Sequence, residues 1–338
     1  MKSSHSKTYS ALVVVGSANE ERAFGITSGQ RVAQALKNRG WSITVADAAQ
    51  KMDLIKQMSD KQFDLVVPVG FGLNSPEDGT IFTVAKFFGI PCAGPGPFCG
   101  AVCTDKSIFQ SVVRGIFDSA DSNNGRLYVR TPNTFLVSRF ASRDALEKGI
   151  QSLPLPLVLK PAYGGSSIGI LIAGTYGEAI EHANKVKEST GRLLVQELIS
   201  AREISSTIID MPDHVHLCPL VELEKRGSLI LDYDAKFGVS ATSRHMIPAP
   251  FPPDITDAVK RIVSTLHSAI GFCGVTRVDA LIDEDKSEMI VLEANPIAGM
   301  LESSIATDAA RADGIDFETL AEAYALTAFR VREEVCLL

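Results

Sequence analysis

The feature that most constrains the fold is a pair of alternating segments near the C-terminus, residues 275–283 and 288–295. A polar turn separates them, so they predict a β-hairpin. If the hairpin is centred near residue 286, Asp279 lies opposite Glu293 and Arg277 lies opposite Asn295. Because side chains alternate along a strand, these four polar side chains are expected to share one face.

The opposite face of this hairpin is expected to be entirely apolar and to pack in the core. Its members would be Val278, Ala280, Ile282, Ile290, Leu292 and Ala294. A change of register by one residue would bury the charges and expose this apolar set. The hydrophobic pattern therefore specifies how the two strands pair.

The polar face of the hairpin suits a divalent cation. Directly opposed Cβ atoms lie roughly 4.5–5.5 Å apart, so Asp279 and Glu293 would repel each other unless a cation lies between them. Mg²⁺ prefers one or two carboxylates, completed by water and phosphate oxygens. Asp279, Glu293 and Asn295 are therefore candidate ligands of Mg²⁺, with Mn²⁺ as an alternative, and Arg277 suits an anionic group beside them. The competing interpretation is a solvated face on which Arg277 neutralises both acids.

A second segment carries a lysine and a glycine–serine loop. The apolar run 155–159 predicts a buried strand that ends at Lys160, and Gly164, Gly165, Ser166 and Ser167 follow. Glycines permit close approach of the backbone to a ligand, and the amides of such a loop can bind an anion. Alone, the loop is most often a turn and the lysine a strand end that reaches water. Combined with the hairpin, the segment favours a binding site for ATP and magnesium.

These segments, in this order, resemble the ATP-grasp superfamily, and most closely the D-alanine–D-alanine ligase family, over nearly the whole chain. The segments around Glu21 and Glu77–Gly79 also resemble that family's motifs. The resemblance implies an α/β fold of three units, with ATP bound between the second and third, which are α+β units. The units would be an N-terminal parallel-sheet domain (1–105), a central ATP-grasp subdomain (106–200) and a C-terminal subdomain with the metal and acceptor sites (201–338).

The resemblance also assigns roles by position, for a ligase that forms a C–N bond and releases ADP. Glu21 would hold the ammonium of the first amino acid, Arg277 and the Gly299 amide would stabilise the oxyanion, and Ser304 would hold the second amino acid's carboxylate. Ser167 joins Glu21, Arg277 and Gly299 among the catalytic candidates. The implied ATP-binding residues are Lys106, Lys160, Gly165, Ser166, Ser167, Gln196, Glu197, Ile199, Glu203 and Lys236.

Departures from the family pattern gather around substrate positioning. The family usually has an acid at Gly164, a glutamine at Phe82, a proline at Ala298 and a tyrosine at Phe237, and a histidine that often precedes its Glu-Asp-Gly motif is missing. Three hypotheses follow: a D-alanine–D-alanine ligase, which would serve peptidoglycan synthesis; a ligase for other amino acids in secondary metabolism; and a non-catalytic ATP-binding module. The complete set of metal ligands disfavours the third.

Composition excludes other classes of protein. The 338 residues carry a net charge of −7 and no basic run, which argues against a nucleic-acid partner. No apolar stretch is long enough to span a membrane, so a cytoplasmic protein is expected, and the resemblance suggests a homodimer. The six cysteines lack zinc spacing, and His214 and His216 lie on a predicted solvated edge rather than at a metal. Expected helices cover 22–39, 101–114, 178–188, 255–270 and 317–333, and expected strands of the first unit cover 12–16, 43–46 and 65–69.

Overall fold

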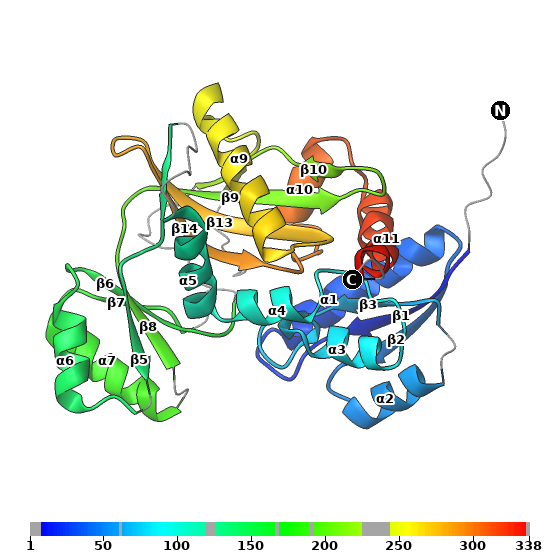
Figure 1. Ribbon diagram of the computed structural model, residues 1–338, viewed down its shortest axis with the longest axis horizontal. Helices are drawn as coiled ribbons and strands as arrows, with labels where there is room; N and C mark the ends of the chain where they lie inside the picture. Colours follow the sequence, from blue (N-terminus) through cyan, green and yellow to red (C-terminus); the bar gives the residue numbers. More distant parts are fainter. Residues whose placement is uncertain are drawn as a thin grey trace.

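The chain is organised around three β-sheets in the computed structural model (Figure 1). The structure describes residues 8–60, 63–118, 126–138, 140–165, 169–189, 192–224 and 244–335. Helices pack on the faces of all three sheets.

The first sheet is parallel and has the strand order β2-β1-β3. Its elements are β1 (Ser10–Val15), α1 (Arg22–Asn38), β2 (Ser42–Asp47), α2 (Lys51–Ser59), β3 (Leu65–Val69), η1 (Pro76–Asp78) and α3 (Thr80–Phe87). One face packs on α1 and the C-terminal helix α11 (Phe317–Val335), and the other face packs on α2 and α3. Both faces are therefore buried, which explains the continuous apolar runs of β1 and β3 and confirms the predicted parallel sheet.

Two helices replace the single helix that was expected over 101–114. They are α4 (Pro97–Thr104) and α5 (Lys106–Phe117). Asp105 between them is extended (φ −100°, ψ 102°), and its carboxylate accepts hydrogen bonds from the backbone N–H groups of Ser107 and Ile108. This N-cap starts a new helix and places Lys106 at its first position.

The second sheet is antiparallel, with the strand order β5-β8-β6-β7. Its elements are β5 (Thr134–Ser138), α6 (Arg143–Gln151), β6 (Leu157–Pro161), β7 (Leu171–Ala173), α7 (Tyr176–Ser189) and β8 (Arg192–Glu197). Both helices pack on the same face of this sheet in one hydrophobic cluster. Lys160 lies near the end of β6, as expected from the sequence.

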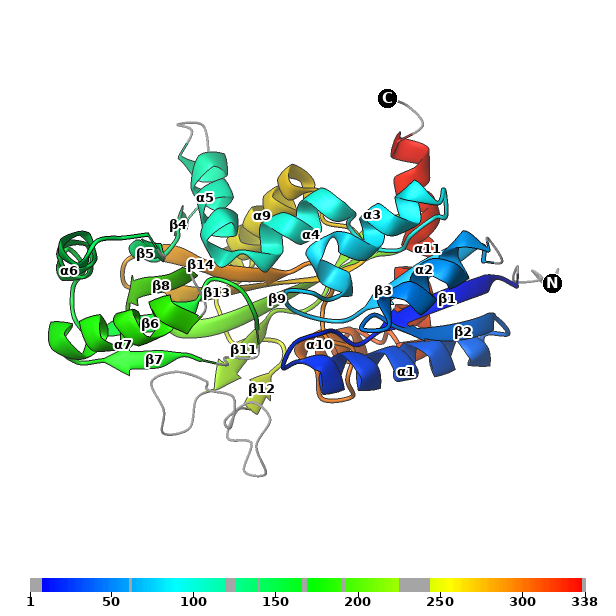
Figure 2. The ribbon, with the colours of Figure 1, turned by 90° about the horizontal axis from the view of Figure 1, so that it is seen from below.

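The third sheet is the largest, with the strand order β12-β11-β9-β13-β14-β4, and β10 also pairs with β9. Its elements are β4 (Tyr128–Arg130), β9 (Arg202–Asp210), β10 (Val215–Leu217), β11 (Val221–Glu224), β12 (Arg244–Met246), α9 (Pro253–Ile270), β13 (Val275–Asp283), β14 (Glu288–Asn295) and α10 (Ile305–Ala312). Helices α5 and α9 lie on one face, whereas α10 and the first sheet lie toward the other (Figure 2). Helices α4 and α5 thus pack with this sheet, and β4 pairs with β14. The division into three units at 105 and 200 stays a prediction.

The β13–β14 hairpin has the predicted register at its functional end. Arg277 pairs with Asn295 and Asp279 pairs with Glu293. The register then shifts between Asp279 and Ala280, so that Leu292 is an extra residue in a β-bulge. The expected apolar face was therefore wrong at Ile290 and Leu292. The side chains of this hairpin that pack in the core are Val278, Ala280, Ile282, Met289, Val291 and Ala294.

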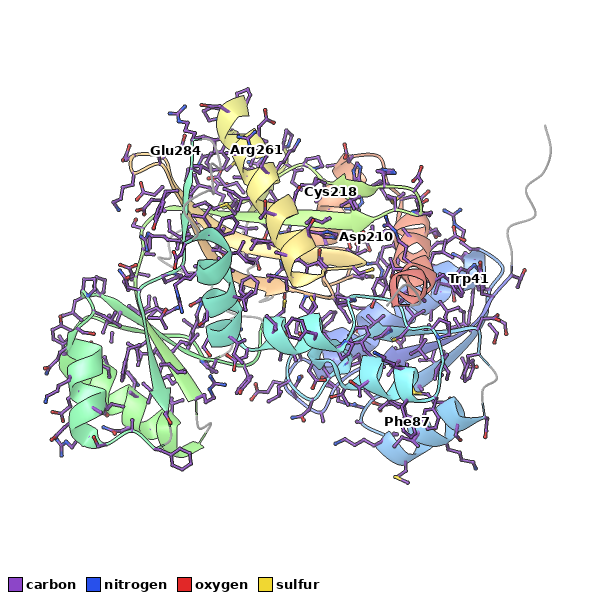
Figure 3. All side chains as sticks on the ribbon, viewed as in Figure 1. Trp41, Phe87, Asp210, Cys218, Arg261 and Glu284 are labelled. Atoms are coloured by element: carbon purple, nitrogen blue, oxygen red, sulfur yellow. The ribbon has the colours of Figure 1, made fainter. Side chains whose placement is uncertain are left out.

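Asp210, at the end of β9, connects the third sheet to helices α9 and α11 (Figure 3). It is buried, and it accepts hydrogen bonds from the Gly274 N–H (2.8 Å) and from Arg330 of α11 (2.9 Å). The His267 ring of α9 lies 3.1 Å from the same carboxylate. Removal of this carboxylate would leave these partners uncompensated.

Candidate active site

A cavity of about 130 Å³ is enclosed by residues from all three parts of the chain. Its walls include η1 and the start of α1 from the first part, the glycine loop from the second, and β12, β14 and α10 from the third. Eight of the predicted site residues line it: Glu21, Lys106, Gly165, Arg277, Glu293, Asn295, Gly299 and Ser304. Segments far apart in the sequence are thus brought together as the sequence predicted.

Asp279 lies behind the wall of this cavity and organises the hairpin's polar face. Arg277 donates to it through Nε (2.9 Å) and NH2 (2.7 Å), and the Asn295 amide donates at 3.3 Å. The Ser205 hydroxyl also donates to Asp279. Burial alone would lower the pKa of Arg277, but the charges of Asp279 and Glu293 raise it, so the guanidinium stays cationic.

This donor set fits Mg²⁺ that arrives with a phosphate ligand. It offers the carboxylates of Asp279 and Glu293 and the amide of Asn295, which are oxygen donors of the kind that Mg²⁺ prefers. Across the described ranges, no cluster of three or more His, Cys, Asp or Glu side chains could hold a metal by itself. Phosphate oxygens and water would therefore have to complete the coordination.

Two of the three predicted ATP lysines line one small cavity with Glu293. Lys106 Nζ lies 3.4 Å from a carboxylate oxygen of Glu293 and donates to the carbonyl of Gly164. Lys160 is buried and lines a smaller cavity of about 40 Å³ together with Lys106, Gly165 and Glu293. Positive charge is thus gathered beside the metal-ligand candidates, where the phosphates of a nucleotide would need it.

Glu21 reaches from the first part of the chain to the glycine loop of the second. A Cβ on Gly165 would lie 2.9 Å from Glu21 Oε1, and a Cβ on Gly72 would lie 2.8 Å from Glu21 Oε2. Real Cβ atoms do not tolerate such contacts without a shift of the neighbour. Glycine at both positions therefore lets the Glu21 carboxylate lie between the two backbones.

Glu77 lines the same cavity, although sequence reasoning gave it no role beyond its place in a motif. One of its oxygens accepts the Gly72 N–H, and Oε2 has no hydrogen-bond partner among the residues that the structure describes. Burial raises the pKa of Glu77 well above its usual range, and the charge of Glu21 raises it further. Burial and the charge of Glu21 therefore favour the neutral form of the Glu77 carboxyl group.

His245 is a second lining residue that sequence reasoning missed. It lies on β12, and its Nδ1 is 2.7 Å from Asp308 on α10. No local motif marks this histidine, because its place in the cavity depends on the order of strands in the third sheet. Glu77, by contrast, could have been found from the motif that contains it.

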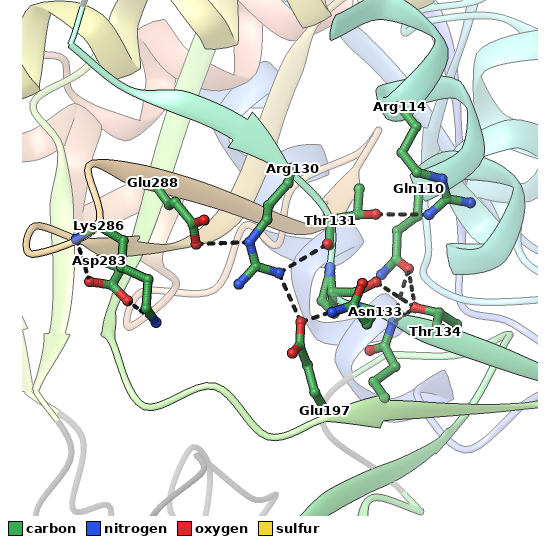
Figure 4. A network of polar contacts seen from close by, with 12 residues as sticks. Gln110, Arg114, Arg130, Thr131, Asn133, Thr134, Glu197, Asp283, Lys286 and Glu288 are labelled. Carbon is green, nitrogen blue, oxygen red and sulfur yellow. Dashed lines mark hydrogen bonds and ion pairs between the residues drawn. The ribbon is translucent and has the colours of Figure 1, made fainter. Parts of the chain in front are cut away.

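The predicted adenine-binding segment is fixed by side-chain contacts. The buried Gln196 donates to Gln110 (2.9 Å) and Thr134 (2.7 Å), while Glu197 accepts from Arg130 at 2.8 Å (Figure 4). Arg130 also donates to Glu288 at 2.8 Å. Gln196 Nε2 and one carboxylate oxygen of Glu197 are thus hydrogen-bonded within the protein.

The other predicted positions lie near the cavity or outside the described residues. Ile199 and Glu203 are half-buried and do not line the main cavity. Ser166, Ser167 and Lys236 fall outside the described residues, as does Phe237. Their roles stay predictions.

The histidines and cysteines that were considered as metal ligands have other environments. His214 pairs with Asp213 and His216 pairs with Asp313, each at 2.7 Å. The five cysteines in the described part of the chain are free thiols. Within the same residues, no helix has both the length and the apolar character needed to cross a membrane.

Comparisons with known proteins agree with this site. A family model described as the D-ala D-ala ligase C-terminus matches residues 133–324. The D-alanine–D-alanine ligase of Thermotoga petrophila is 30% identical over 321 residues, which cover 94% of this chain and 96% of that protein. The D-alanine–D-alanine ligase of Carboxydothermus hydrogenoformans is 29% identical over 314 residues, or 92% and 95% of the two chains.

Solved structures show the same fold. A crystal structure of D-alanine–D-alanine ligase from Bacillus anthracis superimposes with a TM-score of 0.78 at 26% identity, covering 96% of this chain and 99% of that one. The D-Ala:D-Ser ligase of Enterococcus faecalis gives a TM-score of 0.75 at 20% identity, covering 95% and 100%. This chain therefore belongs to the D-alanine–D-alanine ligase family of ATP-grasp enzymes and is an ATP-dependent ligase that joins a carboxylate to an amine.

Proposed function

We propose that this protein joins two molecules of D-alanine, using ATP and Mg²⁺, to make a dipeptide for peptidoglycan synthesis. The observation that carries the proposal is the single cavity shared by Glu21, the phosphate lysine Lys106 and the acceptor-side residues Arg277 and Ser304. The relatives named D-alanine–D-alanine ligase, which match over nearly their whole length, support D-alanine as the substrate.

The chemistry explains why such a site needs fixed positive charge. A carboxylate is a poor electrophile, because an amine that attacks it would have to expel oxide. Transfer of the γ-phosphoryl group to the carboxylate gives an acylphosphate, and phosphate then leaves when the amine attacks. Both steps develop charge on oxygen, so preorganised cations and hydrogen-bond donors provide most of the catalysis.

At the nucleotide end, lysines would bind the phosphates and the hairpin's acids would bind Mg²⁺. Lys106 and Lys160 would balance the charge of the phosphates, with Lys236 as the third lysine proposed from the resemblance. Asp279, Glu293 and Asn295 would hold Mg²⁺, which when bound neutralises charge on the phosphate oxygens. The Gly165 amide with Ser166 and Ser167 would contact the phosphates, and Gln196, Glu197, Ile199 and Glu203 would contact the adenosine.

At the amino-acid end, the carboxylates would orient the substrate that is activated. Glu21 would bind the ammonium of that amino acid, and the neutral Glu77 would offer a hydrogen bond without a second negative charge. Arg277 and the Gly299 N–H would stabilise the oxyanion formed by amine attack. Ser304 would hold the second amino acid's carboxylate. It lies next to Gly299, since a Cβ added to Gly299 would be 3.1 Å from Ser304 Oγ.

A substrate panel tests the proposal directly. The purified protein is incubated with ATP, Mg²⁺ and single amino acids of both configurations, and phosphate release and dipeptide mass are measured. Phosphate release specific to D-alanine supports the proposal, whereas release with other amino acids selects a ligase of secondary metabolism. Tight ATP binding with no turnover on any substrate would select a non-catalytic module.

We also propose that the protein is a cytoplasmic homodimer, as its family resemblance suggests. Exposed apolar side chains on the first unit, Phe87 of α3 (84% exposed; Figure 3) and Met52 of α2 (77% exposed), are candidates for the interface. Size-exclusion chromatography with light scattering tests the dimer, and a monomeric mass at micromolar concentration would contradict it.

A further inference from the structure

His245 lies on the cavity face of the third sheet. Directly paired residues of neighbouring strands share a face, and the pairs His245–Leu223, Val221–Ser205 and Ser205–Asp279 lead from β12 across the sheet to the metal-ligand candidate Asp279. Leu223 and Val221 are two residues apart on β11, so they point the same way. His245 and the hairpin's polar residues therefore face the same cavity, which His245 lines.

Asp308 fixes the orientation of this imidazole. Its carboxylate lies 2.7 Å from Nδ1, and it also accepts a hydrogen bond from Arg311 at 2.7 Å. With Nδ1–H donated to Asp308, the position of the ring is set. Nε2 has no hydrogen bond with any residue in the described part of the chain.

His245 lies near Ser304, the proposed binding residue of the second amino acid, and farther from the atoms that would react. Strand β12 lies three strands away from β13, which is roughly 14 Å at about 4.8 Å per strand. Ser304 precedes the first residue of α10, and its carbonyl accepts the Asp308 N–H, so Asp308 lies in the turn next to Ser304. His245 thus lies at the Ser304 end of the cavity, across from the oxyanion candidate Arg277.

The charged side chains that line the cavity indicate which group of a ligand His245 would bind. A carboxylate removed from water needs a cation or several donors, and Ser304 is neutral. Arg277 is hydrogen-bonded to Asp279 and is assigned to the oxyanion, and Lys106 pairs with Glu293 at the nucleotide end. Among the described residues that line the cavity, His245 is the remaining side chain that can carry positive charge.

We propose that His245, held by Asp308, binds the carboxylate of the acceptor amino acid, the substrate that supplies the amine. This assignment rests on the proposed ligase function and deepens it. The protonated ring would donate Nε2–H to one carboxylate oxygen while Ser304 binds the other. The site would therefore accept amino acids with a free α-carboxylate and reject their amides.

The test is an internal competition between D-alanine and D-alaninamide as acceptors, with ATP and Mg²⁺. Mass spectrometry gives the ratio of the two products, which does not depend on how much of the enzyme is folded. The wild type should prefer the free acid, and His245→Phe should lose roughly 10- to 100-fold of that preference, the effect of one hydrogen bond to a charged group. Asp308→Asn should give a smaller loss, since the ring remains.

A matched control substitutes another histidine. His214→Phe makes the same change at an exposed position, next to β10, and should leave the product ratio unchanged. A His245→Phe ratio equal to that of the wild type would overturn the proposal. So would an equal fall in the His214→Phe control.

Failure of the ligase proposal is distinguishable from failure of this one. If the wild type forms no dipeptide from D-alanine but uses another amino acid, the competition is run with that amino acid and its amide. If no substrate turns over, calorimetric titration of D-alanine with a non-hydrolysable ATP analogue present replaces it. Weaker binding of D-alanine by at least about 10-fold in His245→Phe then supports the carboxylate contact, and unchanged binding refutes it.

Discussion

Replacement of Glu77 by glutamine tests whether the cavity holds a neutral carboxylic acid. Glu77 is 7% exposed, and burial followed by the charge of Glu21 raises its pKa well above the usual range. Glutamine has nearly the same shape and is neutral at every pH. It can still accept the Gly72 N–H through its amide oxygen.

The sign of the effect follows from proton uptake. A carboxyl group with a raised pKa binds its proton more tightly in the folded protein than in the unfolded chain. Its contribution to stability is complete below the unfolded pKa of about 4.3, and it is lost as the pH rises from there through the folded pKa. Within that window the free energy of unfolding of the wild type should fall by about 1.4 kcal/mol per pH unit relative to Glu77→Gln.

Urea unfolding at a series of pH values from acid to neutral measures this difference. The Glu77→Gln variant should become progressively more stable than the wild type as the pH rises. Glu20→Gln makes the same change of charge at an exposed position and should follow the wild type at every pH. Parallel curves for Glu77→Gln and the wild type would show that Glu77 is not held neutral.

Three further changes test other parts of the structure. Glu293→Ala should reduce turnover to background because it removes a proposed Mg²⁺ ligand beside Lys106, and retention of most activity would refute that role. Gly165→Ala places a Cβ 2.9 Å from Glu21, and the resulting displacement should lower kcat/KM roughly 100-fold in steady-state assays; an unchanged value would mean that the loop adjusts freely. Asp210→Ala breaks a buried ion pair and should cost about 3–5 kcal/mol in urea unfolding. A loss below about 1 kcal/mol would contradict the anchoring role of Asp210.

The pairing of the hairpin strands could be predicted because charged and apolar residues alternate along them. A strand with charged residues on one face and apolar residues on the other has a register that burial itself enforces. The break before α5 could also have been found, since Asp105 is followed by a helical segment whose free N–H groups it caps. It was missed because the residues on both sides of Asp105 favour helix.

Other features of the site could not be predicted, because they depend on contacts between distant segments. The raised pKa of Glu77 results from the surfaces that bury it and from the charge of the Glu21 carboxylate. The role proposed for His245 requires the strand order β12-β11-β9-β13 and the placement of α10 over the sheet. The sequence around Glu77 and His245 indicates neither the burial of Glu77 nor the strand order that places His245.

The bulge at Leu292 explains how the polar face of the hairpin extends beyond the metal site. In strict alternation, Glu288 and Glu293 would lie on opposite faces, because they are five residues apart. The extra residue restores them to one face, where Glu288 pairs opposite Asp283 and bonds Arg130, which also holds Glu197. Bulges near functional sites commonly redirect side chains in this way. One inserted position thus places Glu288 on the face that carries the proposed metal ligands, and Arg130 connects Glu288 to Glu197 of the strand proposed to hold adenine.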